Sequence, residues 1–158
     1  AQEMDHVDQY LELERIRLSE SIQFQWNIAP DVVPSVIPCP LFILQPLVEN
    51  AIWHGLSGKG VAQPSLAINV QWHNQDLVIA VCDNGTGIRP KADPQSDHKS
   101  RGTAIVKERL ALLRHRGQLE ILDCPEGHPF ERGVMARMTL PLWALEPTWH
   151  ANEERKAS

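Results

Sequence analysis

The sequence predicts an α+β fold, an α/β sandwich in which a mixed or antiparallel sheet carries helices on one face, preceded by one amphipathic helix. Its strand candidates come in consecutive pairs between helical segments, which favours such a sheet. Hydrophobic residues make up 42% of the 158 residues, enough to build one core. The net charge of −5 argues against a nucleic-acid binder. Because the longest apolar runs are far shorter than about 20 residues, no membrane contact is expected either.

The first element is predicted to be a helix from about Glu3 to Phe24. Its apolar residues recur at steps of three, four or seven, which indicates one helical stripe that needs a partner surface: Met4, Val7, Leu11, Leu18 and Ile22, widened by Tyr10 and Leu13. A short strand is expected at Trp26–Ile28. Four prolines follow between residues 29 and 40, and they predict an extended connector because proline lacks a backbone N–H.

The remaining elements are assigned by their apolar pattern. Helices are predicted at Leu41–Leu56, with Pro46 in an early turn, and at Thr103–Arg116, whereas residues 89–101 predict a polar loop. Strands are predicted at Leu66–Trp72, Leu77–Cys82, Leu119–Leu122 and Val134–Leu142. The three cysteines have neither an even count nor a CxxC spacing, so we expect no disulfide framework and a reducing compartment, with Cys82 in the core.

Two groups of polar residues could carry chemistry. Glu49 and Asn50 lie at the flank of an apolar helix, where they could simply begin the solvent face. Asn50, Trp53 and His54 share a helix face at i, i+3 and i+4, and such a face could instead line a pocket.

The second group follows an apolar strand and reads Asp83-Asn84-Gly85-Thr86-Gly87-Ile88. Asn-Gly alone is a turn signal, and a hairpin is the simple alternative. A polar loop follows instead of a strand, which weakens that alternative. A carboxylate at a strand end can accept a hydrogen bond from a ligand amine, and glycines let backbone approach a flat ring. Gly102 then opens a helix whose first amides can face an anion.

Four runs together resemble the ATP-binding domain of LytS-type sensor histidine kinases. They are QPLVENAIWHG (residues 45–55), DNGTGI (83–88), RGTAIVKERL (101–110) and TLPL (139–142), and the leading YLELERIRL (10–18) resembles the helix before that domain. The resemblance covers residues 8–143. Four ordered motifs at suitable spacing are far more specific than any one of them.

The resemblance implies the Bergerat fold and a Mg-ATP site. It implies that Asn50 helps to hold Mg²⁺ and that Asp83 accepts from the adenine amino group. Gly85 and Gly87 would give the base room, and Glu49 would join Asn50 in the catalytic motif. The remaining ATP-binding residues that it implies are Trp53, His54, Ile88, Gly102 and Thr103, with residues 89–101 as the lid.

The resemblance also implies partners and a domain layout. The γ-phosphoryl group would pass to a histidine and then to a response regulator, and the intact protein would be a homodimer. We expect residues 1–26 to be the end of a dimerisation helix, 27–40 a connector, 41–145 the ATP-binding domain and 146–158 a polar tail. The domain would be cytoplasmic, with the intact protein anchored in the bacterial inner membrane.

Several positions depart from the family's usual pattern. Trp53 stands where the family usually has lysine, so a phosphate-pairing cation is missing or comes from Lys99 or Arg101. The lid end loses one glycine, the leucine and the asparagine, and Val134 replaces a threonine. Each loss is expected to weaken binding by about 1 kcal/mol, in sum by about one to two decades.

No His-Phe pair occurs, so the phosphoacceptor histidine is expected to lie upstream of Ala1. His6, which precedes Val7, is interpreted as a helix-surface residue. Two alternatives to a kinase domain remain. One is a degenerate module kept for signalling or dimer contact, which the altered lid favours. The other is a related ATPase, or a serine kinase that acts on a partner protein.

Overall fold

The computed structural model describes residues 2–18, 22–35, 37, 42–56, 61, 63–88, 96–112 and 117–141. Its elements are α1 (Gln2–Leu18), β1 (Gln23–Ile28), α2 (Gln45–Asn50), the π-helix η1 (Ala51–Leu56), β2 (Ser65–His73), β3 (Asp76–Asp83), α3 (Ser96–Leu112), β4 (Gln118–Asp123) and β5 (Val134–Pro141). The strands form one sheet in the order β1-β2-β3-β5-β4. β1 runs parallel to β2 and the other neighbouring pairs are antiparallel. The predicted mixed sheet is therefore confirmed.

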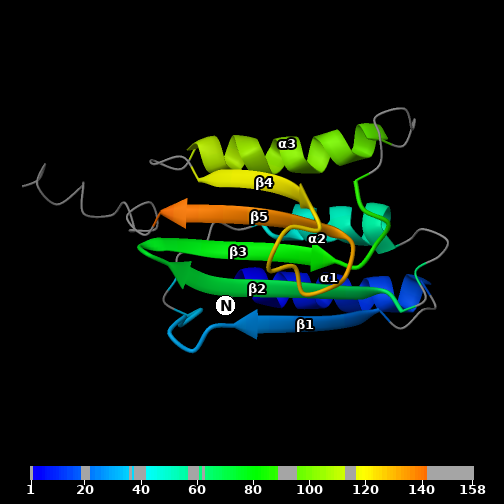
Figure 1. Cartoon of the computed structure of the whole chain (residues 1–158), viewed down its shortest axis with the longest axis horizontal. Coiled ribbons are helices and arrows are strands. Elements are labelled where there is room, and N and C mark those ends of the chain that lie inside the picture. The colour runs from blue at the N-terminus through cyan, green and yellow to red at the C-terminus, as the bar shows by residue number, and fades with distance from the viewer. Residues whose placement is uncertain are drawn as a thin grey trace, which may run out of the picture.

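The helices cover one face of this sheet. Figure 1 shows α1 and α2 lying behind the strands, with α3 running beside β4. Side chains of a strand alternate between faces, and β3 illustrates the result. Leu77, Ile79 and Val81 belong to the large core shared with the helices, whereas Ala80 and Cys82 belong to a small cluster on the opposite face. Cys82 is fully buried, as predicted.

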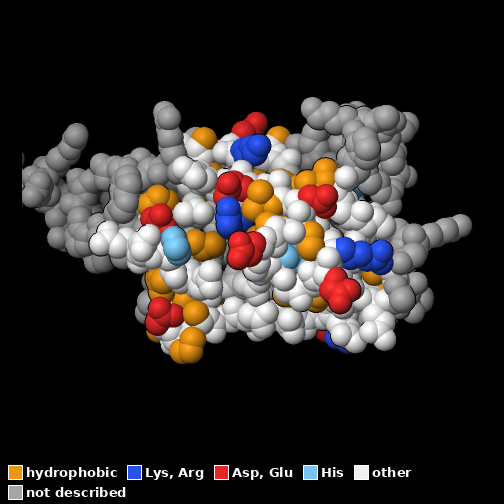
Figure 2. Space-filling model, viewed as in Figure 1, with side chains coloured by type: hydrophobic (Ala, Val, Ile, Leu, Met, Phe, Trp, Pro, Cys, Tyr) orange, Lys and Arg blue, Asp and Glu red, His pale blue; other side chains and the backbone are white. Residues whose placement is uncertain are grey.

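The opposite face of the sheet is more polar. Figure 2 shows charged side chains of both signs there, separated by apolar ones. Arg137 of β5 pairs with Glu120 of β4 at 2.9 Å. In the described part of the chain no helix is long and apolar enough to cross a membrane.

The leading helix is shorter than predicted. It ends at Leu18, and the prediction that it reaches Phe24 is wrong because β1 begins at Gln23. The segment QFQWNI alternates between exposed and half-buried side chains, the two-residue period of a strand. The short strand predicted at Trp26–Ile28 therefore exists but starts three residues earlier.

The stripe of α1 packs on its own chain. Val7 and Leu11 are buried in the main core, so the expectation that they wait for a partner surface is wrong. Leu13, which was predicted to widen the stripe, is instead 67% exposed, and Ile16 is 79% exposed. The helix therefore contributes to the domain's core and leaves a separate apolar pair in solvent.

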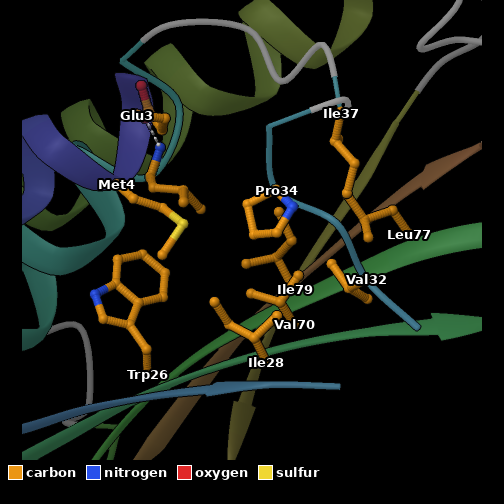
Figure 3. A pocket seen from close by; sticks show the side chains of 11 residues that line it. Glu3, Met4, Trp26, Ile28, Val32, Pro34, Ile37, Val70, Leu77 and Ile79 are labelled. Atoms are coloured by element: carbon orange, nitrogen blue, oxygen red, sulfur yellow. Dashed lines mark hydrogen bonds between the residues drawn. The ribbon is translucent and has the colours of Figure 1, made fainter. Parts of the chain in front are cut away.

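A buried carboxylate fixes the start of α1 to the start of α2. Glu3 accepts hydrogen bonds from the backbone N–H groups of Phe42, at 2.5 Å, and Leu44, at 2.6 Å. Figure 3 shows Glu3 at one edge of a small apolar cavity that also contains Met4 and Trp26. Its volume of about 50 Å³ is far too small for a nucleotide, because ligand pockets span about 300–1,000 Å³.

Both remaining helices differ from their predicted form. The predicted helix at Leu41–Leu56 is α2 followed by η1, with Pro46 in its first turn. α3 begins at Ser96, so the prediction of a loop through Arg101 is wrong for residues 96–101. Residues 96–101 contain no apolar residue, and this absence misled the prediction. Residues 89–95, the expected tail 146–158 and Cys39 lie outside the described residues.

Candidate nucleotide site

Asp83 is a buried carboxylate at the end of β3. Only 3% of the residue is exposed, and its Oδ1 accepts a hydrogen bond from the Gly85 N–H at 2.9 Å. The Val134 N–H also donates to Oδ1, at 3.4 Å. Two backbone donors therefore hold the carboxylate at the point where the chain leaves the sheet.

Three glycines bring separate chain segments against Asp83. A Cβ at Gly55 would lie 2.5 Å from Asp83 Oδ1, and one at Gly85 would lie 2.2 Å from the Gly55 carbonyl oxygen. Gly133, at a φ of +125°, would place a Cβ 1.7 Å from the Asp83 carbonyl oxygen. Every contact is far shorter than a real Cβ allows. The end of η1, the loop after β3 and the start of β5 therefore meet here with no side chain between them.

Asn84 fixes the loop to the start of β2. Its Oδ1 accepts from the Ser65 N–H at 2.9 Å, and its Nδ2 donates to the Gln63 carbonyl oxygen at 2.8 Å. The next described element after β3 is α3, so the Asn-Gly pair does not close a two-residue hairpin. The hairpin alternative is thereby excluded.

Gly87 and Ile88 are held by a residue that the sequence pattern did not single out. Asp123, at the end of β4, accepts a hydrogen bond from the Ile88 N–H at 3.2 Å. Gly87 has a φ of +80°, and a Cβ there would lie 2.7 Å from Asp123 Oδ1. Ile88 itself is 45% exposed. The glycine is therefore required by both conformation and space.

Asn50 is the second predicted site residue with an unusual environment. Its Nδ2 atom is buried and has no hydrogen-bond partner among the residues that the structure describes. A Cβ at Gly102 of α3 would lie 2.6 Å from this Nδ2. α2 and α3 thus meet through an amide and a glycine. Since buried amides are normally satisfied, the amide of Asn50 has the geometry of a group that a ligand completes.

Glu49 faces a different neighbour. Its Oε1 accepts from Gln45 Nε2 at 2.8 Å, within α2. The charges of Glu14 and Glu49 both act on the Tyr10 phenol of α1. Burial raises the pKa of the Tyr10 phenol above its ordinary value, and Glu14 and then Glu49 raise it further. Adjacent helical residues diverge by about 100°, and here Glu49 is close to α1 while Asn50 is close to α3.

Trp53 carries a cation on its exposed ring. The residue is 52% exposed on η1, and the Arg17 guanidinium carbon lies 3.9 Å from the ring centroid. Arg17 also pairs with Glu14, at 3.0 Å between Nη2 and Oε2. Sequence reasoning missed Arg17 because its contact with Trp53 joins two segments that lie far apart in the chain.

The predicted site residues thus meet at two places along the continuous segment formed by α2 and η1. Gly55 of η1 touches Asp83, whereas Asn50 at the end of α2 touches Gly102. His54 and Thr103 are half-buried on the same helices, η1 and α3. Among the described residues no group of three His, Cys, Asp or Glu side chains could hold a metal ion.

The residues present fit a magnesium nucleotide. Mg²⁺ keeps several waters and takes one or two protein oxygens, so an amide oxygen at Asn50 suffices without a cluster of carboxylates. The buried Nδ2 of Asn50 is a donor that suits a phosphate oxygen, and the oxygen of the same amide is the atom that would hold Mg²⁺. At the other end, the buried carboxylate of Asp83 and the bare backbone of Gly85 suit a flat ring that bears an amino group.

Comparison with known proteins agrees with this geometry. Residues 41–144 match the family "Histidine kinase-, DNA gyrase B-, and HSP90-like ATPase". The chain is 31% identical over 153 residues to the sensor protein LytS of Oceanobacillus iheyensis. This match covers 88% of this chain and 24% of that protein. It is 37% identical over 110 residues to the sensor histidine kinase BtsS of Escherichia coli, covering 70% of this chain and 18% of that protein.

Solved structures share the fold at low identity. The catalytic domain of the histidine kinase ThkA superposes with a TM-score of 0.58 at 14% identity, covering 89% of this chain and 90% of that one. The histidine kinase domain of the Erythrobacter litoralis EL346 blue-light activated kinase gives a TM-score of 0.57 at 15% identity, covering 88% and 60%.

The chain spans about a quarter or less of the length of these curated relatives. It belongs to the histidine kinase-, DNA gyrase B- and HSP90-like ATPase family, and it corresponds to the ATP-binding catalytic domain of sensor histidine kinases.

Proposed function

We propose that this domain binds Mg-ATP between Asp83 and Asn50 and donates the γ-phosphoryl group to a histidine outside these 158 residues. The observation that carries the proposal is the pairing of two features on one helix. Gly55 is pressed against the buried Asp83 carboxylate, and the unsatisfied amide of Asn50 lies one to two turns earlier. The adenine ring would bind at Asp83, and a magnesium-bound phosphate would bind at Asn50.

Each residue then has a distinct task. Asp83, fixed by the Gly85 N–H, accepts a hydrogen bond from the adenine amino group. Gly85 and Gly87 keep side chains away from the base. Asn50 supplies an oxygen to Mg²⁺, which neutralises charge on the phosphates. Because positioning and charge neutralisation carry most of phosphoryl transfer, these residues need to supply no covalent chemistry.

Other predicted site residues are proposed to support this site. His54 and Thr103 flank it from η1 and α3, and Ile88 offers an exposed apolar side chain at its adenine end. Glu49, whose carboxylate accepts a hydrogen bond from Gln45 within α2, is proposed to act as a catalytic group next to Asn50 in the motif.

The intact protein is proposed to be a homodimeric sensor kinase that passes phosphate to a response regulator. Its relatives by sequence are named as sensor proteins, and this chain matches only a part of each. We further propose that the domain is cytoplasmic and belongs to a membrane-anchored protein.

A titration with a non-hydrolysable ATP analogue and Mg²⁺ tests the binding proposal. Saturable binding by the folded chain supports it, whereas no binding at millimolar nucleotide would refute it. We also expect no self-phosphorylation by these 158 residues, because they contain no His-Phe pair. Labelled phosphate on the chain would contradict that expectation.

A degenerate module is the second candidate, and Val134 is the observation that favours it. Its N–H donates to Asp83 Oδ1 at 3.4 Å, but valine lacks the hydroxyl that the family's usual threonine would place near the adenine end of the site. This candidate predicts binding without phosphoryl transfer when the upstream histidine helix is supplied. Transfer under those conditions would exclude it.

A further inference from the structure

The helix that carries Asn50 has no permanent positive charge of its own. Residues 42–56 contain neither lysine nor arginine, and they contain Glu49. Mg-ATP keeps a net negative charge after Mg²⁺ has bound. A phosphate chain beside Asn50 would therefore lie against a helix that offers it no cation.

A guanidinium from α1 lies on this helix. Arg17 Cζ is 3.9 Å from the centroid of Trp53, which follows Asn50 by three residues. Asn50 is the last residue of α2, and Trp53 lies in the first turn of η1, which directly follows it. A cation this close to an aromatic face is held electrostatically by the ring. The charge is thus placed about one turn beyond Asn50.

Glu14 forms an ion pair with the Arg17 guanidinium and leaves most of its N–H donors available. The Glu14 side chain is 8% exposed and its Oε2 lies 3.0 Å from Arg17 Nη2. A guanidinium has five N–H donors in a planar fork, so one ion pair leaves most of them available. The Arg17 side chain is 45% exposed, which leaves it accessible to a ligand.

We propose that Arg17 is a specificity-determining residue of the nucleotide site, whose guanidinium, held over Trp53 and oriented by Glu14, contacts the phosphate chain of Mg-ATP. The inference rests on the proposed nucleotide binding and adds a residue to it from the leading helix. It explains why α1 packs against the domain beside the site helix, and it makes α1 part of the binding site.

The test compares a non-hydrolysable Mg-ATP analogue with adenosine, which has the ring but no phosphates. Arg17→Ala is expected to weaken binding of the analogue about tenfold, the scale of one charge-assisted hydrogen bond. Binding of adenosine should weaken less than twofold. Arg17→Lys keeps the charge but loses the planar fork over Trp53, so its loss of affinity for the analogue should lie between those of the parent and Arg17→Ala. Arg15→Ala is the matched control, because Arg15 lies on the same helix, half-exposed and paired with Glu12 at 3.1 Å.

Rescue separates a contact with phosphate from a structural role. Trp53→Lys added to Arg17→Ala returns a positive charge to the site helix, and it should restore the analogue's affinity to within about threefold of the parent. If Arg17→Ala lost equal affinity for the analogue and for adenosine, or lost no affinity for either, the proposed role of Arg17 would be overturned. Nucleotide binding by the domain would still stand. A parent chain that is folded and binds neither ligand would overturn the proposed function as well.

Discussion

The side-chain amide of Asn50 lies so close to the α-carbon of Gly102 that a Cβ at residue 102 would come within 2.6 Å of Nδ2. This contact joins α2 to α3 and leaves the amide buried without a hydrogen-bond partner. It therefore connects the proposed magnesium ligand directly to α3, which begins within the predicted lid segment 89–101.

Gly102→Ala is expected to separate binding from stability. Alanine favours a helix over glycine by about 1 kcal/mol, and the atom that it meets ends a flexible side chain, so the free energy of unfolding should stay constant or rise. Displacing the Asn50 amide should weaken Mg-ATP binding about tenfold, the scale of one lost ligand contact. Urea unfolding and calorimetric titration measure the two effects, with the exposed Ala104→Ser on the same helix as the control. Unchanged affinity would contradict the assigned role of Asn50.

Asp83→Asn should damage binding of the base while leaving the fold in place. Asparagine keeps an oxygen that can accept from the Gly85 N–H, but it loses the charge that is proposed to face the adenine amino group. The affinity for ATP should fall about 10- to 100-fold, the range for a hydrogen bond to a charged group. Asp76→Asn, at the opposite end of the same strand, is the matched control in the same titration. Equal affinities for the two variants would remove Asp83 from the site.

Two glycines with positive φ should respond very differently to alanine. A Cβ at Gly133 would lie 1.7 Å from backbone at Asp83, whereas one at Gly127, at a φ of +80°, meets nothing within 4 Å. Gly127→Ala should cost about 1 kcal/mol from its conformation alone, and Gly133→Ala about 3 kcal/mol or more. Chemical denaturation measures both. Similar costs would show that β5 does not approach Asp83 as described.

The stability of the domain should fall in alkali partly because of Cys82. Burial raises the pKa of this thiol from 9.0 to about 12, and the Asp83 charge contributes. The folded chain then keeps a proton that the unfolded chain loses. The stabilisation is complete below pH 9 and is lost as the pH rises from about 9 to about 12.

The free energy of unfolding, measured between pH 8 and pH 10.5, should decline more steeply in the parent than in Cys82→Ala. Both proteins retain Tyr10, whose raised pKa acts in the same direction, so the difference isolates the thiol. Parallel slopes would contradict a buried, neutral Cys82.

Much of the sheet could be predicted from the sequence, because half-buried strands repeat every two residues. β2, β3, β4 and β5 were predicted within one or two residues of their bounds. The start of α3 and the end of α1 were predicted incorrectly. Residues 96–101 carry no apolar pattern, and QFQWNI carries a two-residue period that the longer helical stripe concealed.

The site was predictable only in part. Asn50 and Asp83 carry motif signals, and their roles in nucleotide binding stay predictions. The approach of Gly55 to Asp83 and of Arg17 to Trp53 depends on how distant segments pack, and no local pattern encodes such contacts. Glu49 stays a predicted catalytic residue.

The most direct test of the account is a map of backbone amide shifts on addition of a non-hydrolysable ATP analogue with Mg²⁺. The account predicts saturable shifts at Asn50, Gly85 and Gly102, with little change at Gln71 and Arg137 on the opposite face of the sheet. Shifts confined to that opposite face, or none at millimolar nucleotide in a folded chain, would contradict it.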